Sequence, residues 1–380
     1  MLTTRNVGGS AAYCNARPGA GTVGSEGGNL MSELQHTGAS IAAYLAKHWS
    51  CDCRLVAIEQ IPGGASRETY RVWLDRSAEK IGVVVRRDPP SSLIDTERAH
   101  EYRTYQCVHA HGVVPVPRPI ALEEDPQILR NGLLRPFSIM SLIEEGQASP
   151  AGLSEPSMQP HLGMLGEQKW SLLGQLARLT PADLGVDSFM STPDHPAANE
   201  LAYWKSVIET DALHPQPIAA AALRWLEQHL PAPSPTLTLV HGDYRTGNFL
   251  YTPDGQITAV LDWEMAHIGD PLEDLAWSLD PLWSDSPALA GRLLPRAEAL
   301  SIWQRASGQP VDRKAFQWWQ IFASVKAIAI WISSAENFVN GTTKEPILAF
   351  AGWPMIDRQN RILLDRLSPE TEHRYAEAIL

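Results

Sequence analysis

The sequence predicts an α+β fold in two parts, with strands concentrated in the N-terminal part and helices in a larger C-terminal part. Before residue 145, short apolar runs rich in β-branched residues alternate with turn residues, which is typical of strands. Beyond residue 150 the apolar residues recur at helical spacing. The chain has 380 residues, 44% of them hydrophobic, so both parts are long enough to bury a core.

The individual elements follow from the same patterns. Residues 1–30 include seven glycines and show neither a helical nor a strand period, so we expect a flexible tail there. The elements predicted next are a helix at 36–49, strands at 55–61, 69–74 and 81–86, a helix at 96–111, and strands at 120–122 and 136–143. The later helices are predicted at 161–179, 199–212, 217–230, 271–279, 289–307, 312–338 and 347–367.

Composition excludes several classes of function. The formal net charge is −12, whereas a nucleic-acid partner would demand a basic stripe on the protein. No run of eighteen apolar residues occurs, so no membrane span is expected. Four cysteines, at positions 14, 51, 53 and 107, do not make a disulfide framework in a chain of this length. We expect free thiols in a reducing cytoplasm.

The most informative stretch is His241-Gly-Asp-Tyr-Arg-Thr-Gly-Asn248, followed fourteen residues later by Asp262-Trp-Glu. Two short apolar runs around a Pro-Asp-Gly turn separate Asn248 from Asp262, which predicts a β-hairpin centred near Gly255. The two residues then lie opposite each other at its open end. Paired strands are roughly 5 Å apart, so both side chains can reach one hard cation such as Mg²⁺.

Asp243 adds a second feature to this stretch. It stands five residues before Asn248, which is the aspartate-to-asparagine spacing of a kinase catalytic loop. A carboxylate that orients a hydroxyl, beside two groups that hold magnesium, supplies what phosphoryl transfer needs from a protein, because its barrier is lowered mainly by positioning and charge neutralisation.

Three segments carry a resemblance to a known family. They are Leu239 to Leu250, Val260-Leu-Asp-Trp-Glu264 and Gly269-Asp-Pro-Leu-Glu-Asp-Leu-Ala276. The chain resembles the aminoglycoside phosphotransferase-like family, and within it the phosphotransferase domains associated with acyl-CoA dehydrogenases. The resemblance covers most of residues 36–365 and implies a bilobal protein-kinase-like fold, with a small antiparallel β-sheet N-lobe and a larger, mainly helical C-lobe.

The resemblance also implies a division of labour. Residues 31–145 would form the nucleotide-binding lobe, with the hinge at its end, and residues 146–380 the catalytic and substrate-binding lobe. Asp243 would be the catalytic base, and Asn248 and Asp262 would be the magnesium ligands. His241 would brace the loop without carrying a proton.

The N-terminal part offers residues for ATP. Strand, glycine loop, strand is an arrangement that lets backbone N–H groups close over phosphates, and Gly63, Gly64 and Ser66 lie in such a loop. In the resembling fold, main-chain groups of the hinge hydrogen-bond a purine. We place this contact near Met140 to Leu142.

The third strand ends in Arg86-Arg87, where kinases normally carry a lysine that pairs with phosphates and with a helix glutamate. Arginine carries the same charge on a longer, forked side chain. Alternation along the strand directs the two arginines to opposite faces. We assign Arg86 to the cleft, with two solvated arginines as the alternative. Its partner is assigned to Glu101, with Glu97, one turn earlier, as the second choice.

The predicted function is transfer of the γ-phosphoryl group of ATP, with Mg²⁺, to a hydroxyl of a small molecule. The resemblance suggests a hydroxylated acyl-CoA or a related catabolic intermediate. An aminoglycoside is the second hypothesis, because six acids that could attract a polyamine lie between Glu264 and Asp285. A third is a non-catalytic nucleotide-binding regulator, since an arginine replaces the expected lysine.

Overall fold

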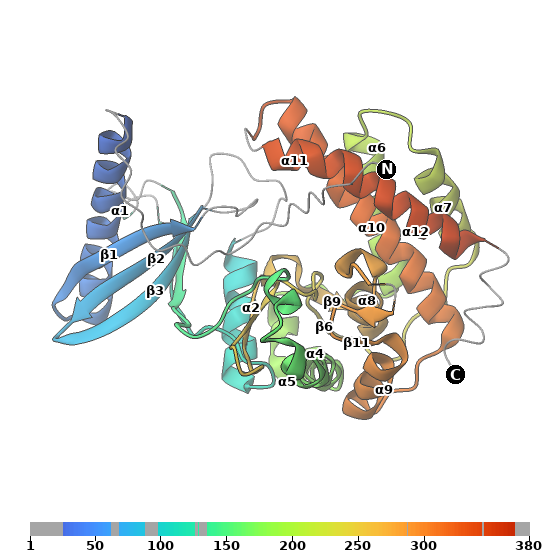
Figure 1. Ribbon diagram of the computed structural model, residues 1–380, viewed down its shortest axis with the longest axis horizontal. Helices are drawn as coiled ribbons and strands as arrows, with labels where there is room; N and C mark the ends of the chain where they lie inside the picture. Colours follow the sequence, from blue (N-terminus) through green and yellow to red (C-terminus); the bar gives the residue numbers. More distant parts are fainter. Residues whose placement is uncertain are drawn as a thin grey trace.

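The computed structural model describes residues 26–61, 68–87, 98–125, 128, 135–286, 288–343 and 346–368. It confirms the α+β architecture with a sheet-containing N-lobe and a mainly helical C-lobe (Figure 1). Residues 1–25 of the expected tail lie outside the described residues. The first helix, α1 (Glu26–Trp49), begins within the stretch predicted to be a tail and is longer than the helix predicted for residues 36–49.

The N-lobe contains one antiparallel sheet of five strands in the order β1-β2-β3-β5-β4. Its strands are β1 (Cys53–Ile61), β2 (Glu68–Arg76), β3 (Glu79–Arg87), β4 (Pro119–Glu123) and β5 (Phe137–Ser141). Side chains alternate between faces along a strand, and in β2 the alternate residues Tyr70, Val72 and Leu74 are buried. Helix α1 packs Ile41 and Leu45 into the same core.

Helix α2 (Arg98–His111) lies between the sheet and the C-lobe, as Figure 1 shows. Its buried residues include Glu101 and Tyr105, whose side chains belong to the site described below. The N-lobe therefore contributes the end of β3 and helix α2 to this site.

The C-lobe is built around α10 (Arg313–Val339), a helix of 27 residues that is buried along most of its length. An all-round apolar helix is the kind that lies inside a protein. Helix α10 packs against α6 (Pro196–Asp211), α7 (Pro217–Gln228), α8 (Pro271–Ser278), α11 (Pro346–Phe350) and α12 (Ile356–Leu367). The lobe also contains α4 (Leu162–Ala177), α5 (Pro181–Leu184) and α9 (Arg296–Ser307), and α4 packs against α9.

Short strands connect these helices and carry the loops of the site. Strand β6 (Thr238–Val240) pairs with β9 (His267–Gly269), β7 (Phe249–Tyr251) with β8 (Ile257–Val260), and β10 (Leu289–Ala290) with β11 (Leu294–Pro295). The predicted hairpin is thus present as β7–β8. The helix predicted for 289–307 begins only at Arg296, because the β10–β11 hairpin takes its first residues.

Two expectations concern the whole chain. In the part of the chain that the structure describes, no helix combines the length and apolar character needed to cross a bilayer. Cys51, Cys53 and Cys107 are free, and Cys14 lies outside the described residues.

Candidate active site

Asp243 lies in the loop between β6 and β7, and its carboxylate is surrounded by N–H donors. Asn248 Nδ2 donates to Oδ2 at 2.7 Å, and Trp277 Nε1 donates to Oδ1 at 2.8 Å. Arg245 Nε lies 3.1 Å from each oxygen. The loop and helix α8 therefore hold this carboxylate in one orientation.

The β7–β8 hairpin brings Asn248 and Asp262 to its open end, but the register differs by one residue from the predicted one, so Asn248 lies opposite Leu261 and Asp262 follows. Phe249 pairs with Val260, and one step further out the Leu261 N–H donates to the Asn248 carbonyl at 2.8 Å. Asp262 follows in the left-handed region, with φ 70° and ψ 59°. Non-glycine residues held there are uncommon and cluster at functional sites.

His241 braces the loop, as the resemblance implies. Its ring is fully buried, with Nε2 2.9 Å from the Leu261 carbonyl, and its Nδ1 accepts from the Asp243 N–H at 3.2 Å. The imidazole thus links the loop that carries Asp243 to the residue before Asp262.

Asp274 of helix α8 fixes the start of the same loop. Its two carboxylate oxygens accept the main-chain N–H groups of His241 and Gly242, at 2.6 and 3.0 Å. Gly242 has φ +83°, and a Cβ there would lie 2.4 Å from the Met265 carbonyl oxygen. Only glycine fits this position without strain.

In the sequence, Asp270-Pro-Leu-Glu273 has the spacing of a helix capping box, and the structure bears this out for Asp270 but not for Glu273. Asp270 accepts the Leu272 N–H at 2.9 Å and caps α8, and proline follows at the first helical position. Glu273, three residues after the cap and at the usual place for the second half of a capping box, instead forms an ion pair with Lys326 at 2.9 Å.

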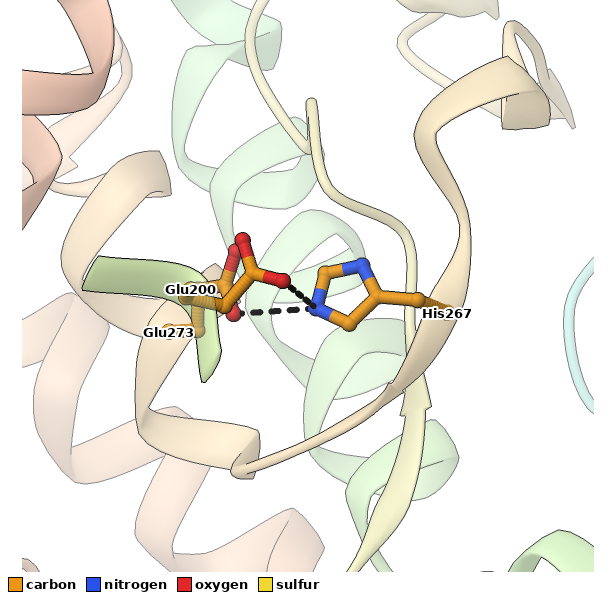
Figure 2. A group of neighbouring side chains, drawn as sticks. All are labelled: Glu200, His267 and Glu273. Carbon is orange, nitrogen blue, oxygen red and sulfur yellow. Dashed lines mark hydrogen bonds and ion pairs between the residues drawn. The ribbon is translucent and has the colours of Figure 1, made fainter. Parts of the chain in front are cut away.

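Lys326 connects this ion pair to the loop that carries Asp243. It is buried in α10, and its Nζ also donates to the Gly242 carbonyl at 2.8 Å. The other Glu273 oxygen lies 3.1 Å from His267 Nε2, and Glu200 from α6 approaches the same nitrogen at 3.6 Å (Figure 2). Burial lowers the pKa of His267, but the two carboxylates outweigh burial and raise that pKa to about 10.

Glu200, His267 and Glu273 also form a possible set of metal ligands, with ligand atoms within 4.8 Å of one another. Two carboxylates and an imidazole can bind a divalent ion. The Lys326 ammonium already pairs with Glu273, however, and with a protonated His267 it balances both carboxylates. We interpret these three residues and Lys326 as an ion network with no net charge, which holds the loop at Gly242 through Lys326.

Arg86 reaches the site from the N-lobe. Its Nη1 forms a very short ion pair with Glu101, and its Nη2 lies 3.1 Å from Asp262 Oδ1 and 3.7 Å from Glu264. Burial lowers the pKa of Arg86, but Glu101 and Asp262 raise it more strongly, so the guanidinium stays charged. A single side chain thus joins β3, α2 and the end of the hairpin.

Arg87 points elsewhere, as alternation along the strand requires. Its guanidinium contacts Glu68 at 2.6 Å and the Tyr70 hydroxyl at 2.7 Å, and Arg135 contacts the same glutamate. Both arginines are therefore held in ion pairs, which excludes the alternative of two solvated strand-end arginines.

Several predicted nucleotide-binding residues lie outside the described residues. They are Gly63, Gly64 and Ser66 of the glycine loop, together with Glu97, the second choice for the partner of Arg86.

The structure narrows the hinge assignment. Met140 is a buried residue of β5, opposite Val84 of β3, and the Leu142 N–H donates to the Gly82 carbonyl at 3.0 Å. The sheet therefore occupies the Leu142 N–H. A purine would have to use the Leu142 carbonyl or groups further along the chain, and a contact near Leu142 stays a prediction.

The sequence did not reveal three of the side chains that hold Asp243, the neighbouring Gly242 and Asp262 in place. Trp277 and Lys326 lie far from Asp243 in the chain, and Tyr105 lies in the other lobe, where its hydroxyl is 2.9 Å from the Asp262 N–H. Arg245 lies inside the motif itself, so its charge beside the aspartate was a signal that could have been used.

These observations define a kinase-like fold whose candidate active-site loop is of the phosphotransferase type. The sequence profile of the phosphotransferase enzyme family matches residues 57–309. The chain belongs to this family.

Curated relatives match part of the chain. Acyl-CoA dehydrogenase family member 10 of Mus musculus is 32% identical over 231 residues, which are 58% of this chain and 20% of that protein. Acyl-CoA dehydrogenase family member 11 of Homo sapiens is 27% identical over 278 residues, 70% of this chain and 34% of that protein. The chain thus spans between a fifth and about a third of the length of these relatives.

Solved structures share the fold at low identity. A putative aminoglycoside phosphotransferase from Ralstonia eutropha aligns with a TM-score of 0.66 and 20% identity, over 89% of this chain and 97% of that one. A choline/ethanolamine kinase family protein from Mesorhizobium loti aligns with a TM-score of 0.55 and 16% identity, over 92% and 99%. A thermostable mutant of aminoglycoside phosphotransferase APH(4)-Ia, in a ternary complex with ADP and hygromycin B, aligns with a TM-score of 0.53 and 16% identity, over 85% and 98%.

Proposed function

We propose that this protein is an ATP- and Mg²⁺-dependent phosphotransferase that moves the γ-phosphoryl group to a hydroxyl of a small molecule. One observation carries the proposal. The Asp243 carboxylate is hydrogen-bonded to Asn248, and the hairpin joins Asn248 to Asp262, which faces the Arg86–Glu101 pair of the other lobe. This connected group supplies a candidate base, two candidate oxygen ligands and a fixed cation, which supports the proposal.

The side chains at the hairpin end fit magnesium. Asn248 uses its Nδ2 on Asp243, which leaves the amide oxygen as the atom available to a metal. The Asp262 side chain is 34% exposed and offers carboxylate oxygens beside it. Mg²⁺ prefers such oxygen ligands and keeps several waters. When bound, it would neutralise charge on the phosphates of ATP.

The remaining roles follow from the positions of the protein's own groups. Asp243 would accept a hydrogen bond from the acceptor hydroxyl and orient it toward the phosphoryl group. Arg86, fixed by Glu101, would place a permanent positive charge beside Asp262 and the phosphates. The same ion pairing removes the reason for the regulator hypothesis, because arginine here takes the glutamate partner expected of the lysine.

An acceptor rich in amines is disfavoured by the local charges. All six acids that could attract a polyamine already have partners within the protein. Those partners are Arg86 for Glu264, the Leu272 N–H and Trp319 for Asp270, Lys326 and His267 for Glu273, the His241 and Gly242 N–H groups for Asp274, Arg366 for Asp280, and Arg292 for Asp285. We favour a hydroxylated acyl-CoA or a related intermediate over an aminoglycoside, in line with the names of the curated relatives.

The test combines turnover with nucleotide binding. Pure protein is incubated with Mg-ATP and a panel of CoA esters, sugars and aminoglycosides, and ADP and the phosphoester are measured. Asp243→Asn should lower kcat by at least about 10²-fold, as for loss of a general base, while nucleotide affinity changes little. Equal loss of turnover and of nucleotide binding would contradict the role of Asp243. Absence of a phosphoester from every acceptor would contradict the proposed activity.

A further inference from the structure

The Asp243 carboxylate has no spare acceptor direction in this arrangement. Oδ1 accepts from Trp277 at 2.8 Å and from Arg245 at 3.1 Å, and Oδ2 accepts from Asn248 at 2.7 Å and from Arg245 at 3.1 Å. A carboxylate offers about four lone-pair sites. An acceptor hydroxyl can therefore donate to Asp243 only when one of these contacts yields.

Arg245 is the contact that can yield. Trp277 and Asn248 are 2% and 6% exposed, and both are fixed in packed surroundings. The Arg245 side chain is 29% exposed, and a single Nε–H is shared between the two oxygens. Shared hydrogen bonds at 3.1 Å are longer than the 2.7–2.9 Å range usual for charged pairs. The guanidinium is therefore the least constrained of the three donors.

The rest of the guanidinium is available to an anion. Its plane rests over the Trp283 ring at 5.0 Å, and Nη1 makes a long contact of 3.5 Å to the Thr246 carbonyl. A guanidinium has five N–H donors, and no other hydrogen bond from Arg245 occurs within the described residues. The buried Trp283 Nε1 likewise has no hydrogen-bond partner within those residues.

Two further basic side chains lie near Arg245. Lys169 is buried next to Thr246, with Nζ 3.3 Å from its hydroxyl. Arg292 donates to the Pro150 carbonyl at 3.1 Å, and its one ion-pair partner in the described part of the chain is the exposed Asp285. An anion bound at Arg245 would therefore lie near the Arg292 charge and would favour the protonated form of Lys169 over the neutral amine.

We propose that Arg245 determines which acceptors are used, by binding a carboxylate or phosphate oxyanion that the acceptor carries close to its reacting hydroxyl. This inference rests on the proposed function, and among the acceptors favoured there it selects related intermediates with a free oxyanion near the hydroxyl over CoA thioesters, whose acyl part is neutral. The oxyanion replaces the Asp243 oxygens as partner of the guanidinium, and the freed oxygen accepts the hydroxyl. A neutral acceptor carries no oxyanion that could replace Asp243 as the partner of Arg245, so the Asp243 oxygens stay hydrogen-bonded to the guanidinium.

The experiment uses matched acceptors that differ in charge. They are 3-hydroxybutanoate against 3-hydroxybutanamide, and glycerol 3-phosphate against glycerol, which distinguishes a carboxylate from a phosphate. Wild-type protein should show a KM about 10- to 100-fold lower for the anionic member of at least one pair, the range expected for a charge-assisted hydrogen bond.

Substitution of Arg245 should reverse the preference. Arg245→Gln should lose the advantage of the anionic acceptor and improve kcat/KM for the neutral one, because Asp243 is uncovered. Arg245→Lys, which keeps the charge, should retain part of the anionic preference. Arg305→Gln removes one charge from a side chain that is 63% exposed and should leave both acceptors unchanged. A merely structural role for Arg245 would lower turnover of both acceptors together.

Calorimetric binding of the same four probes, without nucleotide, separates this inference from the proposed activity. Tighter binding of the anionic probe that Arg245→Gln abolishes supports the anion site, even where no phosphoester forms and the proposed activity fails. Equal affinity for the charged and neutral members of both pairs, or a preference that survives in Arg245→Gln, would overturn the inference.

Discussion

Lys169 is a buried lysine whose removal should stabilise the protein. It is 0% exposed, its Nζ hydrogen-bonds the Thr246 hydroxyl at 3.3 Å, and it lies 4.7 Å from the Trp170 ring. No carboxylate pairs with it within the described residues. Burial, and to a smaller extent the charge of Arg245, lower the pKa of Lys169 from 10.5 to about 7.

The magnitude follows from this shift. A fall of the pKa from 10.5 to about 7 corresponds to about 5 kcal/mol of preference for the neutral amine in the folded state. Between these pH values the unfolded chain binds more protons, so this group makes stability rise with pH. Below pH 7 the unfavourable term is fully present. Lys169→Met should therefore stabilise by about 3–5 kcal/mol at pH 7, and the gain should shrink toward zero by about pH 10.5.

The assay is urea unfolding of wild type and Lys169→Met at pH 7, 8.5 and 10. Methionine keeps most of the aliphatic volume, so the change of packing is small. The same substitution at the exposed Lys314 is the control and should alter stability by less than about 0.5 kcal/mol at each pH. A Lys169→Met protein that is less stable than wild type at pH 7, or a difference that does not vary with pH, would refute the reasoning.

Three further predictions concern the loop and its support. Asp262→Ala should weaken Mg-dependent nucleotide binding by at least about tenfold in calorimetry, because a carboxylate ligand is lost, and unchanged metal dependence would remove Asp262 from the ligand set. Gly242→Ala should destabilise by about 2–4 kcal/mol in urea, since its Cβ would lie 2.4 Å from the Met265 oxygen; Gly308→Ala, also at positive φ but with open space, should cost only about 1 kcal/mol, and equal losses would contradict the clash. The raised pKa of His267 gives stability that is fully present below pH 6.5 and lost as pH rises toward about 10; His267→Gln should therefore destabilise by about 3 kcal/mol at pH 6 and by little at pH 10, and a difference that is independent of pH would argue against the ion network.

The sequence could predict the part of the site whose geometry is local. A turn at Gly255 sets the register of a two-stranded hairpin, and the register in turn places Asn248 beside the residue preceding Asp262. Alternation along β3 likewise separates Arg86 from Arg87. In both cases the residues that decide the geometry lie within one element, so spacing is sufficient.

The hinge could not be predicted in the same way. The end of a strand and the segment after it differ in whether their main-chain groups are hydrogen-bonded within the sheet. The side-chain sequence gives little indication of that difference. Met140 and Leu142 were assigned by resemblance, yet β3 and β4 take up the main chain as far as the Leu142 N–H. Only the paired strands reveal where free groups begin.

The ion pair that holds the loop, between Lys326 and Glu273, was not predicted for another reason. The pattern of α10 does contain a sign of it. Lys326 interrupts the apolar run between Ile321 and Ile332. A charged side chain at the centre of a buried helix requires a buried partner, because an unpaired charge there is strongly unfavourable. The identity of that partner, Glu273, depends on how α8 packs against α10, and spacing in the chain holds no information about it.

Two buried lysines therefore support the two ends of the catalytic loop in opposite ways. Burial lowers the pKa of Lys326, but Glu273 outweighs burial and raises it, so the ammonium that holds the Gly242 carbonyl stays charged. Lys169 hydrogen-bonds Thr246 but pairs with no carboxylate in the described part of the chain. Burial, and to a smaller extent the charge of Arg245, lower its pKa. Any acceptor group that draws the guanidinium toward an anion also relieves Lys169, so binding at Arg245 should raise the pKa of Lys169 and take up a proton near neutral pH. Lys326, by contrast, keeps its charge through its pairing with Glu273, so its contact with the Gly242 carbonyl persists near neutral pH.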